Sequence, residues 1–93
     1  MSLVRKRFLA TGSVQGVGFR HSAAITARRL RLVGWVRNLP DGAVELHAQG
    51  DTESVEEMEE WLRRGPAMAR VTGLVALEVP PETGETSFSI RHY

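Results

Sequence analysis

Hydrophobic residues recur at helical spacing in two segments of the chain. In the first segment they are spaced by four, four and three residues, and they are Phe19, Ala23, Ala27 and Leu30. The second segment, residues 51–66, has a hydrophobic face made of Val55, Met58, Trp61 and Leu62. Arginines crowd the last turn of both segments, where positive charge complements the helix dipole. We therefore predict two helices, the second of which ends at Gly65 and Pro66.

The start of the second helix has several candidate capping residues. Asp51, Thr52 and Ser54 are all residue types that cap helices. Ser54 and Glu57 also have the spacing of a capping box. Acidic residues follow in the first turn, where they complement the positive end of the helix dipole.

Five other segments have the composition and patterning of strands. Residues 33–38 and 43–49 flank the sequence Leu-Pro-Asp-Gly, which predicts a turn and therefore a β-hairpin. The remaining strands are expected at 4–13, 71–80 and 86–93. Strands and helices then follow one another in the order of a split βαβ unit. The expected fold class is α+β: a ferredoxin-like sandwich with an antiparallel four- to five-stranded sheet and two helices on one face.

Length and composition narrow the class of protein. Ninety-three residues, of which 42% are hydrophobic and 25% charged, predict a single domain over 1–93 with its own core. The net charge of +1 gives no argument for nucleic acid or membrane as a partner. No apolar run approaches the ~20 residues that span a bilayer, and no secretory signal is visible. The absence of cysteine excludes thiolate catalysis and disulfides. We expect a monomer in the cytoplasm.

A glycine-rich stretch, "GSVQGVGFR", lies between the first strand and the first helix at residues 12–20. The N–H groups at a helix start have no intrahelical partner, and glycines let successive amides turn around one small anion. Arg20 adds a forked, permanent positive charge in the first helical turn. The stretch therefore suggests a cradle for one phosphate. Its spacing fits neither a Walker A loop nor a dinucleotide-binding loop. Spacing alone leaves open a tight turn with a solvated Arg20.

Asn38 is the second candidate for chemistry. It lies directly before the Leu-Pro-Asp-Gly turn, and its amide could hold a water through one donor and one acceptor. Asparagine also commonly initiates turns, so Asn38 on its own favours a structural role.

The two stretches together resemble the signatures of the acylphosphatase family. Residues 12–20 match Gly-x-Val-Gln-Gly-Val-x-Phe-Arg, and residues 34–50 match Gly-aromatic-Val-basic-Asn, then Gly-x-Val and a last Gly at family spacing. Residues 61–74 and the closing "FSIRHY" are similar to the family as well. Ala10 and the "HSAA" after Arg20 depart from its usual pattern, but they lie outside the motif positions.

The resemblance implies hydrolysis of small acyl phosphates to a carboxylate and inorganic phosphate. It implies that Arg20 binds the phosphoryl group and that Asn38 positions the attacking water. The phosphate cradle would be completed by the amides of Gln15, Gly16, Val17, Gly18, Phe19 and Arg20. The motif residues include no metal-ligand cluster, so we expect no metal and no cofactor.

Two other functions are considered. An RNA-binding module can have the same fold, but the third predicted strand has no aromatic residue on which a base could stack. A phosphate- or carbamoyl-phosphate-binding module without turnover is the alternative, because acylphosphatase-like domains also occur within larger hydrogenase-maturation proteins.

The other histidines, arginines and tryptophans are expected to lie in solvent or to have structural roles. His21 is expected to be solvated or to cap the helix, and any effect of His21 or Ser22 on substrate preference is left open. His47 and His92 are expected at the surface, and the arginines of residues 28–31 are expected to be solvated. Trp35 and Trp61 are expected to pack.

Overall fold

The computed structural model describes residues 2–92, which form five strands and two helices. In chain order the elements are β1 (Leu3–Ser13), α1 (Phe19–Arg29), β2 (Val33–Asn38), β3 (Val44–Asp51), α2 (Thr52–Arg64), β4 (Arg70–Val79) and β5 (Phe88–Arg91). Every element predicted from the sequence is present, with bounds that differ by at most two residues. Tyr93, the last residue of the predicted closing strand, lies outside the described range.

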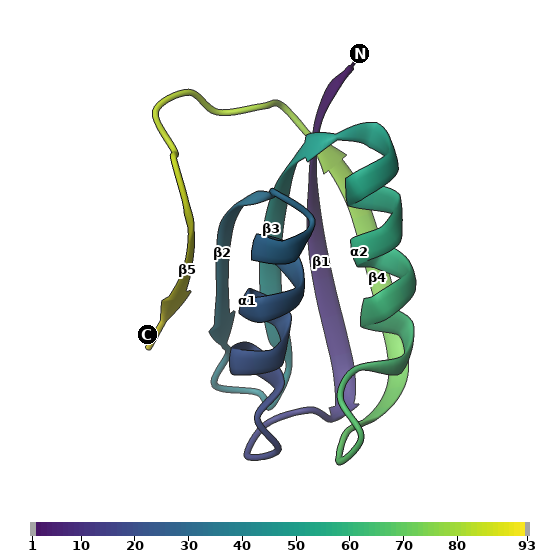
Figure 1. Cartoon of the computed structure of the whole chain (residues 1–93). Coiled ribbons are helices and arrows are strands. Elements are labelled where there is room, and N and C mark those ends of the chain that lie inside the picture. Colours follow the sequence, from purple (N-terminus) through teal and green to yellow (C-terminus); the bar gives the residue numbers. More distant parts are fainter. Residues whose placement is uncertain (1, 93) are drawn as a thin grey trace.

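The five strands form one sheet in the order β4-β1-β3-β2-β5. Neighbours among the first four strands pair antiparallel, and both helices lie on the same face of the sheet (Figure 1). This is the predicted ferredoxin-like arrangement. One detail differs from the expected all-antiparallel sheet, because β5 pairs parallel to β2. The chain crosses from β4 at one edge to β5 at the other edge, and so β5 runs in the direction of β2.

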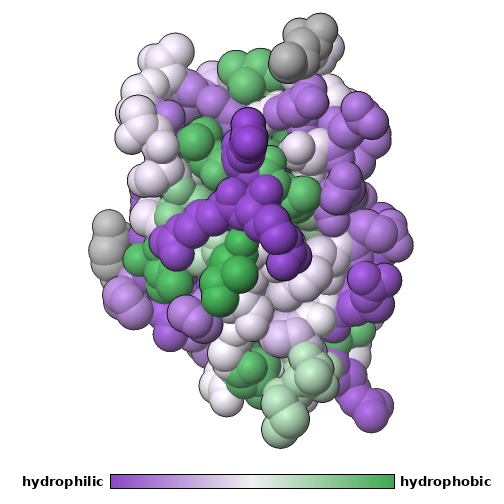
Figure 2. All heavy atoms as spheres, viewed as in Figure 1, coloured by the Kyte–Doolittle hydropathy of each residue, from purple (hydrophilic) through white to green (hydrophobic). Residues whose placement is uncertain are grey.

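The core lies between the sheet and the helices, and alternation along the strands decides which side chains enter it. On β1, Phe8 and Ala10 are buried against the helices. The α1 helix presents Ala23, Ala24 and Ala27 to the sheet, and these small side chains allow close approach. The outer surface of the helices, which faces the viewer in Figure 2, is mainly hydrophilic, with hydrophobic residues in separate spots.

The α2 helix begins at Thr52, whereas the predicted capping box would make Ser54 the N-cap. Its N-cap is Asp51, the last residue of β3, and no side chain makes a capping hydrogen bond there. Ser54 is already inside the helix, so the Ser54–Glu57 capping box is wrong. The reason is that β3 runs into α2 with no loop residue between them. The buried face of α2 is as predicted, and Trp61 packs edge-on against Phe19 with ring centroids 5.7 Å apart.

The short β5 strand is held by side chains from other elements. Arg28 of α1 donates from Nη2 and Nε to the carbonyl oxygen of Phe88, at 2.9 and 3.2 Å. The prediction that Arg28 is only solvated is therefore wrong, although its side chain is exposed. The connection that precedes β5 is fixed by the fully buried Arg5, whose Nη1 lies 2.7 Å from a carboxylate oxygen of Glu85.

The sheet face opposite the helices carries a network of charged and aromatic side chains. Glu45 accepts from Arg7 and Arg37 at 2.7 Å each. Burial by itself would raise the pKa of Glu45, but these two arginines outweigh it and lower the pKa. His47 stacks on Trp35 with centroids 4.5 Å apart.

His47 also accepts a hydrogen bond at Nδ1 from Nε of Arg5, at 3.0 Å. Burial, and after it the charge of Arg5, lowers the pKa of His47. The expectation that His47 lies free at the surface is therefore corrected: its ring is half-buried because β1 and β2 flank it on the sheet.

Candidate active site

The glycine-rich loop joins the end of β1 to the start of α1 and is built around two glycines with positive φ. Gly16 has φ 77° and Gly18, the N-cap of α1, has φ 76°. L-residues with side chains rarely adopt this conformation, so glycine is needed at both turns. Among residues 2–92, we find no hydrogen-bond acceptor for the backbone N–H groups of residues 15–20. These N–H groups are available to an anion, next to the positive end of the α1 dipole.

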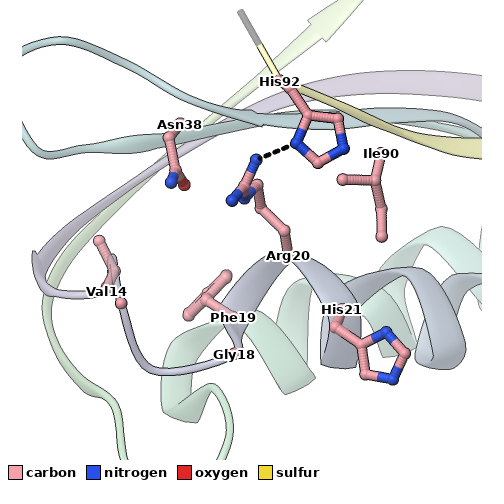
Figure 3. Close-up of a pocket in the computed structure, with 9 residues that line it drawn as sticks. Val14, Gly18, Phe19, Arg20, His21, Asn38, Ile90 and His92 are labelled. Carbon is pink, nitrogen blue, oxygen red and sulfur yellow. Dashed lines mark hydrogen bonds between the residues drawn. The ribbon is translucent and has the colours of Figure 1, made fainter.

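Arg20 lies in the first turn of α1, and its guanidinium is tied to the end of β5. Its Nη1 donates to the carbonyl oxygen of Arg91 at 3.2 Å, and it lies 3.1 Å from Nδ1 of His92 (Figure 3). No other Arg20 side-chain hydrogen bond is present within the described chain. The guanidinium is therefore fixed at one nitrogen, and the remaining donors are free for a ligand.

Asn38 is the last residue of β2 and approaches Arg20 from the sheet. Alternation along β2 turns Arg37 to the open face and Asn38 to the helix face. In Figure 3 the Asn38 amide points toward the space between Val14 and Arg20. Its Oδ1 atom is buried and has no hydrogen-bond partner among the described residues. A buried polar atom without a partner is costly, so this oxygen is suited to accept from a water or a ligand.

Gln15 connects the glycine-rich loop to the turn that follows Asn38. Its Nε2 donates to the carbonyl oxygens of Leu39 at 2.8 Å and Ala43 at 2.9 Å. Both side-chain protons of the amide are thus used within the protein. The side chain of Gln15 therefore fixes the distance between the two motifs.

These residues surround one open cavity of about 210 Å³. It is lined by Val14, Gly16, Gly18, Phe19, Arg20, His21, Asn38, Ile90 and His92. Both predicted catalytic residues are in this set. The predicted cradle residues Gln15 and Val17 are not, although they belong to the same loop. No Asp or Glu is among these lining residues, so the cavity presents positive and neutral groups to a ligand.

Sequence reasoning missed Val14, Ile90 and His92 as residues of the site. Ile90 and His92 come from the end of the chain, and only the parallel pairing of β5 with β2 brings them beside α1. His92 is exposed, as expected, but it also contacts Arg20. The one available signal is the closing "FSIRHY", whose resemblance to the family assigns no role to its individual residues. His21 is exposed at the rim of the cavity and caps nothing.

Within residues 2–92, no group of three His, Asp or Glu side chains is placed to hold a metal ion. No helix of this part of the chain is long and apolar enough to cross a membrane.

Comparison with known proteins decides the family. The family model described as acylphosphatase matches residues 6–90. An acylphosphatase of Methylococcus capsulatus is 56% identical over 87 residues, which cover 92% of this chain and 94% of the relative. The chain belongs to the acylphosphatase family.

Solved structures agree with this assignment. An acylphosphatase from Coxiella burnetii superposes with a TM-score of 0.91 at 38% identity, covering 96% of this chain and 93% of the other. The family resemblance inferred from the two motifs is thereby confirmed, and so is the assignment as an acylphosphatase enzyme. HypF from T. kodakarensis is similar at 30% identity with a TM-score of 0.82. The match covers 95% of this chain but 12% of HypF, so the same fold also forms part of a much larger protein.

Proposed function

We propose that this acylphosphatase cleaves the carboxyl–phosphate bond of small acyl phosphates by direct attack of a water on phosphorus. In this proposal Arg20 and the amides of residues 15–20 bind the phosphoryl group, and Asn38 orients the water. The buried, unpartnered Oδ1 of Asn38, which points into the cavity that Arg20 lines, carries the proposal.

The phosphoryl group is expected between the glycine-rich loop and Arg20. The free N–H groups of the loop and the start of α1 favour a small anion. The free donors of Arg20 can form two parallel bonds to phosphoryl oxygens, because its Nη1 is already fixed by β5. Phosphoryl transfer depends mainly on positioning and on charge stabilisation of this kind.

The attacking water is expected at Asn38. The Oδ1 atom accepts a hydrogen bond from the water, which points a lone pair of the water oxygen toward phosphorus. The water oxygen bonds to phosphorus while the bond from phosphorus to the acyl oxygen breaks. The bonding electrons leave with the carboxylate, and the protons of the water pass to the phosphate product and the solvent. Because a carboxylate is a good leaving group, the step needs no strong general acid.

The proposal is tested by hydrolysis of benzoyl phosphate in excess EDTA, with release of inorganic phosphate as the readout. We expect turnover by the parent protein, and loss of turnover in Arg20→Gln and in Asn38→Ala. EDTA tests the predicted metal independence in the same assay. Full activity of Asn38→Ala would show that another group holds the water.

A non-catalytic module that binds phosphate or carbamoyl phosphate is the second candidate function. This candidate is supported by the similarity of the chain to a segment of the much longer HypF. Phosphate binding through Arg20 without any turnover of benzoyl phosphate or carbamoyl phosphate would establish this alternative. The single-domain organisation over 1–93, the monomeric state and the cytoplasmic location stay predictions. Size-exclusion chromatography with light scattering measures the oligomeric state.

A further inference from the structure

Two arginines of α1 donate to backbone carbonyls at the two ends of β5. At the start of the helix, Nη1 of Arg20 donates to the carbonyl oxygen of Arg91 at 3.2 Å. In the last turn, Nη2 and Nε of Arg28 donate to the carbonyl oxygen of Phe88 at 2.9 and 3.2 Å. Phe88 and Arg91 are the first and last residues of β5. The strand is therefore held against α1 at both of its ends.

Arg28 reaches the edge of β5 that has no neighbouring strand. β5 is the last strand of the sheet, so it pairs with β2 alone. The backbone N–H of Gly34 on β2 donates at 3.2 Å to the carbonyl oxygen of Ser87, which directly precedes β5. Carbonyls of successive residues in a strand point to opposite sides, so the carbonyl of Phe88 is directed to the free edge. The Arg28 guanidinium supplies a donor where the sheet has none.

This contact fixes β5 in a way that burial does not. The Phe88 side chain is buried in the core, but hydrophobic burial has no preferred direction. Two N–H groups of one planar guanidinium, in contrast, meet a single carbonyl oxygen in a defined geometry. Arg28 therefore sets the position of β5 along the axis of α1.

The position of β5 in turn decides where the Arg20 guanidinium lies. Both contacts of Arg20 are at the far end of the strand: its Nη1 donates to the Arg91 carbonyl and lies 3.1 Å from Nδ1 of His92. Figure 3 shows His92 and Ile90 beside Arg20, at the cavity that these residues line. The strand has four residues, so a shift at its start is carried to its end. Such a shift moves both contacts of Arg20 together.

We propose that Arg28 is a positioning residue for Arg20 and that it acts through β5. This rests on the proposed function, in which Arg20 binds the phosphoryl group. Arg28 holds the start of β5 at Phe88, and the end of β5 holds Arg20. The guanidinium of Arg20 is then already in place when the ligand arrives, so binding does not have to restrict its motion. Arg28 itself is not among the residues that line the cavity.

The first test follows the Arg20 side chain by NMR in the protein without ligand. Arg28→Met removes the donors and keeps an unbranched apolar stem. In this variant we expect the Arg20 guanidinium to rotate faster by about threefold or more, as the signal of its Nε–H group reports. Arg28→Lys keeps the charge and a donor, so its value should lie between those of the parent and Arg28→Met. An Arg20 signal that is unchanged in Arg28→Met overturns the proposal.

The second test measures phosphate affinity and turnover of the same variants. We expect the Kd of inorganic phosphate and the KM of benzoyl phosphate to rise by about threefold or more in Arg28→Met. The kcat should stay within roughly twofold of the parent, because substrate and transition state lose the same preorganised contact. Arg28→Lys should restore part of the affinity. A Kd in Arg28→Met equal to that of the parent overturns the proposal.

Two controls separate positioning from loss of charge and from loss of stability. Arg29→Met removes the same charge from the same helical turn, and Arg29 is exposed and makes no ion pair among residues 2–92. It should keep the Arg20 signal and the phosphate Kd of the parent. Val55→Ala opens a cavity at a buried position of α2 and should lower the temperature of unfolding without changing either readout. Equal changes in Val55→Ala and Arg28→Met would show general destabilisation and overturn the proposal.

The role of Arg28 and the proposed function can fail separately. If the parent does not hydrolyse benzoyl phosphate, the proposed function fails, while the Arg20 signal still decides the role of Arg28 because it needs neither ligand nor turnover. If the parent hydrolyses benzoyl phosphate and Arg28→Met keeps its Arg20 signal and its Kd, the proposed function stands and the role of Arg28 is refuted.

Discussion

The side-chain amide of Gln15 donates a hydrogen bond of 2.8 Å to the carbonyl oxygen of Leu39, the residue directly after Asn38. This bond joins the glycine-rich loop to the strand end that carries the water-binding candidate. Gln15 and Leu39 are 24 residues apart in the chain, and the spacing between phosphate and water in the proposed mechanism depends on this connection.

Gln15→Ala should therefore reduce turnover, although it removes no side chain that is proposed to contact the phosphoryl oxygens. We expect kcat to fall by about tenfold to a hundredfold, since small misplacements of reacting groups are costly. The Kd of phosphate should change less than threefold, or roughly 0.6 kcal/mol. Steady-state kinetics and phosphate titration measure the two effects. An unchanged kcat would show that the loop keeps its position without the hydrogen bonds of the Gln15 side chain.

Arg20→Gln should abolish most of the activity through loss of both binding and transition-state stabilisation. Arginines that contact a transferring phosphoryl group are worth about a thousandfold or more in rate. We expect a fall in kcat/KM of at least this size and no measurable phosphate binding. Arg29→Gln is the matched control, because this arginine of α1 is exposed and makes no ion pair within the described chain. It should behave like the parent.

Asn38→Ala should lower kcat much more than it raises KM, because the amide is proposed to hold water and not substrate. We expect a loss of about a hundredfold in kcat. Removal of the buried, unpartnered Oδ1 should leave the unfolding free energy unchanged or slightly increased. Kinetics and urea unfolding of the same preparation test both parts. A large rise in KM with normal kcat would assign Asn38 to substrate binding instead.

The sequence predicted the order of the elements and both catalytic candidates, because periodicity and two motifs are local signals. It did not predict that β5 pairs parallel to β2. This pairing depends on the connection that carries the chain from β4 at one edge of the sheet to β5 at the other edge. Ile90 and His92 were therefore missed as residues of the cavity. The capping box at Ser54 was wrong because spacing alone does not reveal that β3 continues to Asp51. The roles of Arg28 and His47 likewise depend on neighbours that are distant in the chain.

Gly34→Ala should be among the most destabilising single changes in the protein. Gly34 has φ 139°, and a Cβ atom there would collide with the backbone carbonyl of His47 on β3. Strain and the clash together predict a loss of more than about 3 kcal/mol in unfolding free energy. Gly42→Ala is the matched control: its φ is also positive, at 97°, but nothing lies within 4 Å. Its cost should stay near roughly 1–2 kcal/mol.

Stability should fall in two stages as the pH is lowered. The pKa of His47 is below its usual value in the folded state, so the unfolded chain takes up the proton first. Unfolding free energy therefore starts to fall as the pH drops below about 6.5. The pKa of Glu45 is also lowered, so its stabilising contribution is complete above about 4.5 and is lost as the pH falls further.

Urea unfolding from pH 8 to 3 measures both stages. His47→Gln should remove the first stage and Glu45→Gln the second. Because the charge of Glu45 raises the pKa of His47, Glu45→Gln should also enlarge the first stage. A His47→Gln profile identical to that of the parent would show that this histidine does not cause the loss near neutral pH.

The most direct test of the mechanism is hydrolysis of benzoyl phosphate in water enriched in oxygen-18, followed by mass analysis of both products. Attack on phosphorus by a water held at Asn38 predicts that the heavy oxygen enters inorganic phosphate and that benzoate stays unlabelled. Label in benzoate would mean that water attacks the acyl carbon. The proposed roles of Asn38 and Arg20 would then be contradicted.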